Sequence, residues 1–182
     1  MPRKIVAASI VAAVVCIAVL AAAQEPQMPK PGPEHQAMAM FVGKWKFDGT
    51  ANAGAMGPGG KIAFNESCEW YEGGFAVVCD AQGMAPTGPT KSHSIMSYDA
   101  DKKAYTYYAI EKGVPPFMAT GQHDGKIWKW DAESKMGAMT MKTRVTVTET
   151  SATSYTFDMK ASTDGGANWT QVMSGKSTKS GT

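Results

Sequence analysis

Most of this sequence consists of short segments in which apolar and polar residues alternate, separated by clusters of turn-forming residues. Alternation with a period of two is typical of β-strands that bury one face. Glycine and proline clusters such as Gly57-Pro58-Gly59-Gly60 punctuate these segments. The pattern predicts strands at residues 42–51, 61–71, 75–82, 91–98, 104–111, 117–122, 126–132, 139–148, 154–162 and 169–177. Without a long helical period, such a chain is all-β and antiparallel, either a sandwich or an up-and-down barrel.

The phase of the alternation assigns many side chains to a buried face. The residues assigned in this way are Trp45, Phe47, Met139, Met141, Thr143, Val145, Val147, Tyr155, Phe157 and Met159. One buried face per strand favours a single sheet closed around one interior, and therefore a barrel. The segments around His93 and Met118 do not alternate cleanly, so their faces stay unassigned.

The first 34 residues differ in composition from the rest. Arg3 and Lys4 precede an apolar run at residues 5–23 that ends in three alanines, which predicts a signal peptide at 1–23, cleaved after Ala23. The run is also long enough for an uncleaved membrane anchor. Residues 24–34 contain four prolines and predict an extended tether. We expect a periplasmic or secreted protein with one domain at residues 35–179, opening with a short helical turn.

The charge balance excludes one class of partner. The chain has 18 Lys and Arg against 16 Asp and Glu, and cleavage after Ala23 removes two of the basic residues, which leaves 16 of each. Nucleic-acid binding needs clustered basic residues. We therefore expect no nucleic-acid partner, and no membrane span once the signal peptide is removed.

Cys68 and Cys79 are the only cysteines beyond the signal peptide. Residues 69–78 are typical of two strands joined at Gly73-Gly74, a turn that places Cys68 opposite Cys79. Opposed residues have Cα atoms about 4.5–5.5 Å apart, within the range of a disulfide. In an exported protein the pair predicts a disulfide, with two buried free thiols as the alternative.

Glu66 is the most informative polar residue, because it shares a strand face with Phe64, Cys68 and Trp70. A carboxyl group among aromatic side chains has a raised pKa, and such groups favour functional pockets. The alternatives are a bulge that turns Glu66 outward, or a position at the wet mouth of the barrel.

Large apolar side chains on the inner faces either fill the barrel or form the walls of a cavity. The residues predicted to bind a ligand are Glu66, as a polar group, with Trp70, Tyr107, Trp130, Met141 and Tyr155 as apolar walls. Motifs for metal binding or catalysis, such as His-x-His, Cys-x-x-Cys, Gly-x-Ser-x-Gly and His-Glu-x-x-His, do not occur. We expect no metal and no cofactor, and we assign no catalytic residue, although distant groups could still converge in space.

Four motifs together resemble a known family. Gly43-Lys44-Trp45 resembles the motif that opens the first strand of lipocalins and other calycins. With residues 69–75, 97–105 and 172–176 it resembles DUF1579, a bacterial exported family of unknown function, over residues 41–179. Two features depart from that family's pattern, namely Ser97, where glycine is commoner, and the cysteine pair. The resemblance implies a lipocalin-like barrel of about ten strands but no established activity.

These observations lead us to expect an exported barrel that binds a small apolar or amphipathic molecule without catalysis. Two alternatives stay open. One is a structural or interaction module of the cell envelope with a filled barrel, and the other is an enzyme that acts inside the barrel. The identity of the ligand and the oligomeric state do not follow from the sequence.

Overall fold

A computed structural model describes residues 30–54, 57–137 and 139–181. The predicted signal peptide and most of the predicted tether lie outside the described residues. No helix in the described part of the chain is long and apolar enough to cross a membrane.

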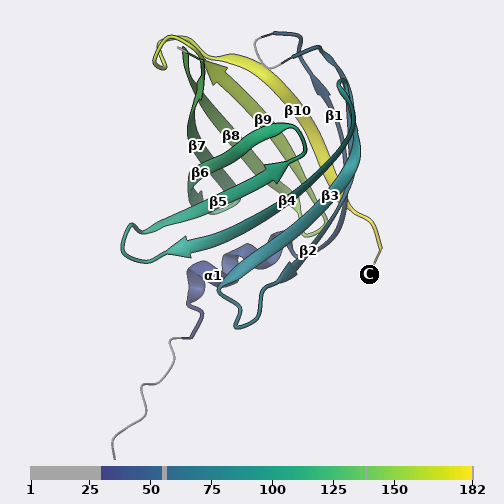
Figure 1. The fold of residues 1–182 in the computed structure, drawn as a ribbon. Helices are drawn as coiled ribbons and strands as arrows, with labels where there is room; N and C mark the ends of the chain where they lie inside the picture. The colour runs from purple at the N-terminus through teal and green to yellow at the C-terminus, as the bar shows by residue number, and fades with distance from the viewer. Residues whose placement is uncertain (1–29, 55–56, 138, 182) are drawn as a thin grey trace, which may run out of the picture.

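Ten antiparallel strands close into a single barrel (Figure 1). They are β1 Gly43–Ala51, β2 Gly60–Trp70, β3 Ala76–Ala85, β4 Gly88–Asp99, β5 Ala104–Glu111, β6 Val114–Asp124, β7 Ile127–Met136, β8 Met139–Ser151, β9 Ser154–Ser162 and β10 Thr170–Lys179. Each strand pairs with the next one in the chain, and β1 also pairs with β10. The predicted up-and-down barrel and all ten predicted strands are therefore confirmed.

The two ends of the barrel differ. Helix α1 (Pro33–Ala37) and the 3-10 turn η1 (Met38–Phe41) lead directly into β1 and lie across one end, at the bottom of Figure 1. We call this the helix end, and the opposite end, which carries the β1–β2, β3–β4, β5–β6, β7–β8 and β9–β10 connections, the loop end. The predicted helical turn is confirmed, and it starts at Pro33, an allowed position because the first turn of a helix needs no proline N–H.

The helix end is sealed by close packing. Met38 is fully buried, and the rings of Phe41 and Trp128 lie 5.0 Å apart. The indole N–H of Trp45 donates to the Phe41 carbonyl at 2.7 Å, and the Tyr105 hydroxyl donates to the Glu34 carbonyl at 3.0 Å. Because Trp45 and Trp128 are also buried, this half of the interior is a solid core.

Burial confirms most of the predicted faces and corrects one. Trp45, Phe47, Thr143 and Tyr155 are buried as expected. Met139 is not, because it is the first residue of β8, at the loop end, and its side chain is 46% exposed.

The structure shows which side chains face inward in the two segments that the sequence left unassigned. In β4 the buried face carries Ser94 and Met96, while His93 is exposed. In β6 Ala119 and Gly121 are buried, and Met118 is 67% exposed. Small residues on the inner face explain why neither segment shows a clear apolar alternation.

Candidate ligand-binding site

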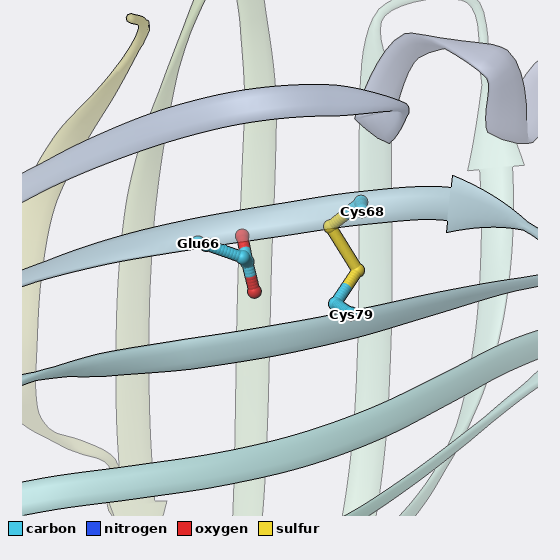
Figure 2. A group of neighbouring side chains, drawn as sticks. All are labelled: Glu66, Cys68 and Cys79. Carbon is cyan, nitrogen blue, oxygen red and sulfur yellow. A yellow bond between two sulfur atoms is a disulfide. The ribbon is translucent and has the colours of Figure 1, made fainter.

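The β2–β3 hairpin positions the first groups of the site. Cys68 and Cys79 are directly paired across β2 and β3, and a disulfide joins them (Figure 2). The hairpin turns at Gly73 and Gly74, with φ values of 88° and 75° that suit glycine. The predicted disulfide and its register are both confirmed.

Glu66 lies two residues before Cys68 on the same face of β2, so its side chain points into the barrel beside the disulfide (Figure 2). A carboxyl oxygen of Glu66 and the two sulfur atoms lie within 4.8 Å of one another. Among the described residues none forms a hydrogen bond or an ion pair with this carboxyl group. Burial alone raises the pKa of Glu66 to about 7.

Two tyrosines share the interior with Glu66. Burial raises the pKa of Tyr107 to about 12 and raises that of Tyr155 further, and the Glu66 charge adds to both shifts. Both phenols therefore stay protonated at neutral pH. The three side chains come from β2, β5 and β9. The Tyr155 ring lies 4.9 Å from the ring of Trp45, the residue paired with Glu66 on β1.

Two buried serines complete this group. Ser94 lies close to Tyr107. Ser177 is the β10 residue directly opposite Tyr155 of β9 in the sheet. Ser177 is fully buried, and within the described ranges its hydroxyl has no hydrogen-bond partner. We call Glu66, Ser94, Tyr107, Tyr155 and Ser177 the interior polar cluster.

Aromatic rings near the cluster lie flat against the barrel wall. A Cβ atom on Gly121 would approach the Trp130 ring to 2.3 Å, and one on Gly175 would approach the Phe47 ring to 2.3 Å. Glycine at these positions therefore lets each ring cover the neighbouring strand.

Exposure changes along the inner face. At the helix end Val77 and Trp128 are fully buried. Toward the loop end Phe64, Tyr107 and Phe117 are only partly buried, whereas Ile62 and Met141 are buried. The inner face around Phe64, Tyr107 and Phe117, on β2, β5 and β6, thus keeps accessible surface, with Glu66 at its base.

The structure brings together most, but not all, of the residues predicted to bind a ligand. Glu66, Tyr107 and Tyr155 belong to the interior polar cluster, and the rings of Trp130 and Tyr107 are 5.8 Å apart. Met141 is buried on β8, opposite Ser134 near the loop end. Trp70 pairs with Val77 at the helix end, so the disulfide lies between it and Glu66.

The two serines of the cluster were not among the residues predicted from the sequence. Ser177 falls in period with Met173 and Gly175, so its inner-face position was available from the alternation in β10. Ser94 was not, because the segment around His93 has no regular apolar alternation.

Two shallow hollows on the outer surface are weaker candidates. One, of about 540 Å³, is lined mainly by exposed polar side chains that include Lys44, Asp80 and Lys91, and Glu66 and Ala81 also contribute to its lining. The other, of about 600 Å³, contains Arg144, which stacks 4.6 Å above the Trp169 ring and pairs with Asp131. Asp80 and Arg144 in these hollows are already paired, with His93 and Asp131, and Lys91 is exposed to solvent.

The closed ten-strand meander, sealed by an N-terminal helix, defines a lipocalin-like β-barrel. Residues 30–179 match the family described as protein of unknown function (DUF1579), and the chain belongs to that family. No curated protein matches the sequence.

Solved structures support the fold. The crystal structure of Rv2717c from M. tuberculosis has a TM-score of 0.57 and 8% identity, and the match covers 82% of this chain and 99% of that one. The S-type phycobiliprotein lyase CPES from Guillardia theta has a TM-score of 0.52 and 8% identity, over 82% of this chain and 93% of that one. At these identities the likeness concerns the barrel alone.

Proposed function

We propose that this protein is exported and binds one small apolar or amphipathic molecule in the half of the barrel nearer the loop end, without catalysis. The observation that carries the proposal is the partly exposed inner face around an unpartnered, partly buried carboxyl group. Apolar pockets with a few polar groups are the usual form of a small-molecule site. The disulfide fits an oxidising compartment.

The sealed helix end supports the same proposal. Because α1 and η1 are packed against the core, a ligand would enter and leave at the loop end. The interior polar cluster would then lie at the base of the pocket and orient the polar part of the ligand.

A second function has one observation in its favour. Ile95, Tyr108 and Met118 are neighbours across β4, β5 and β6 on the outer face, and all three are exposed. An apolar strip of this kind is typical of a surface that contacts a partner. The alternative is therefore an interaction module of the cell envelope.

Native and denaturing mass spectrometry of protein from the exported fraction distinguish the two functions. We expect an additional mass in the native spectrum only, lost in Ala81→Leu, which crowds the position paired with Glu66. Gln82→Leu, on the exposed face of the same strand, is the matched control and should keep that mass. A native mass equal to residues 24–182 less two hydrogens would contradict ligand binding. Loss of a crosslinked partner in Met118→Lys would then support the interaction module.

A further inference from the structure

The inner face of the barrel toward the loop end carries acidic groups without basic ones. Glu66 lies at its base, and Glu111 of β5 pairs with Ser92 at the rim, where it accepts a hydrogen bond from Thr90. Following the alternation of the ten strands, no Lys, Arg or His of the described ranges falls on this part of the inner face. The accessible interior is therefore negative when Glu66 is ionised.

The groups that surround Glu66 do not neutralise it. On β1 its paired residue is Trp45, and on β3 it is Ala81. Tyr107 and Tyr155 face it from β5 and β9 as neutral phenols. Lys179 of β10 is the basic residue nearest in register, but its ammonium group lies 5.1 Å from the Trp45 ring and makes no ion pair with Glu66. Lys44 and Lys91 line an outer hollow to which Glu66 also contributes, and neither forms an ion pair with it among the described residues.

We propose that the ligand is a lipophilic amine, whose protonated nitrogen pairs with the Glu66 carboxylate while its apolar part lies against Trp130 and Tyr107. This inference rests on the proposed ligand-binding function and names the chemical class of the ligand. An ammonium group supplies the positive partner that the protein itself does not place beside Glu66. It also donates charge-assisted hydrogen bonds to a carboxylate and is attracted to aromatic faces.

The other head groups suit this site less well. A ligand carboxylate would meet Glu66 and Glu111, and like charges oppose each other at short range. An alcohol could hydrogen-bond to Glu66, but the negative charge of the Glu66 carboxylate would stay unpaired in a low-dielectric interior. Preference for an ammonium head group is therefore the distinguishing expectation.

The pH dependence of binding has a definite sign. Glu66 has a pKa of about 7, so its ionised fraction increases between pH 5 and pH 8. An ammonium ligand that binds the ionised form should gain affinity by up to roughly 100-fold over this interval, because each pKa unit corresponds to a tenfold change. A carboxylate ligand should lose affinity over the same interval.

Calorimetric titrations with octylammonium, octanol and octanoate, three head groups on one alkyl chain, test the proposal. At pH 8 we expect octylammonium to bind at least about tenfold more tightly than the other two, since one charged pair contributes roughly that much. Glu66→Gln should abolish the preference. Glu69→Gln, an exposed residue of the same strand, should retain it.

Three outcomes would overturn the proposal. Equal or tighter binding of octanol or octanoate, blocked by Ala81→Leu, would refute the amine while supporting a ligand site in the barrel. An unchanged preference in Glu66→Gln would refute the role of that carboxylate. Failure of all three probes would refute the amine, and the native mass would then decide separately whether the barrel binds another molecule.

Discussion

The carboxyl group of Glu66 is enclosed in the barrel, where its pKa is about 7, against 4.5 for an ordinary glutamate. Between these two pH values the folded protein holds a proton that the unfolded chain has released. The free energy of unfolding therefore falls as pH rises through this interval. The protein keeps this residue at a cost to stability at neutral and higher pH, which is expected of a functional group rather than of a packing group.

Glu66→Gln should remove this cost. We expect the variant to match the wild type near pH 4.5 and to be more stable at pH 8, by at most about 3 kcal/mol from the size of the pKa shift. Urea denaturation at pH 4.5, 6 and 8 measures the difference. Glu69→Gln should follow the wild type, and parallel curves for the wild type and Glu66→Gln would contradict the assignment.

At the scale of elements, the η1 turn is as much a part of the core as any strand. Met38 has no exposed surface, so replacing it with Ala leaves a cavity. We expect Met38→Ala to lower the free energy of unfolding by about 2–5 kcal/mol. Met118→Ala, at a residue 67% exposed on β6, should change it by less than about 0.5 kcal/mol. Equal effects in chemical denaturation would mean that the helix end is not sealed.

The β2–β3 hairpin owes part of its stability to the bond between Cys68 and Cys79. These residues are 11 apart in sequence, and closing a loop of this size stabilises a fold by roughly 2–3 kcal/mol in the chain-entropy model. The double variant Cys68→Ala, Cys79→Ala should lose about this amount in urea denaturation. A thiol count on the denatured wild type should rise by two on reduction, and an unchanged count would contradict the bond.

For the whole molecule, local sequence patterns predicted the strands of the barrel well. They predicted the positions of the side chains inside it less well. Period-two alternation located all ten strands, and the Gly73-Gly74 turn fixed the register of the disulfide. Alternation gives the face of a residue but not its height in the barrel, which is why Trp70 was grouped with Glu66. It also fails at strand ends, as Met139 shows. The sealed end and the neighbourhood of Ser94 depend on contacts between distant segments, which no local pattern contains.

The pairing of β1 with β10 joins the first strand of the barrel to the last one. A chain that emerges from a ribosome or an export channel presents β1 early, but one edge of that strand has no partner until β10 has followed. A nascent or truncated chain would therefore be an open, curved sheet with two unpaired edges, the form most prone to association with other chains. An enclosed site for a ligand therefore exists only once β1 and β10 have paired.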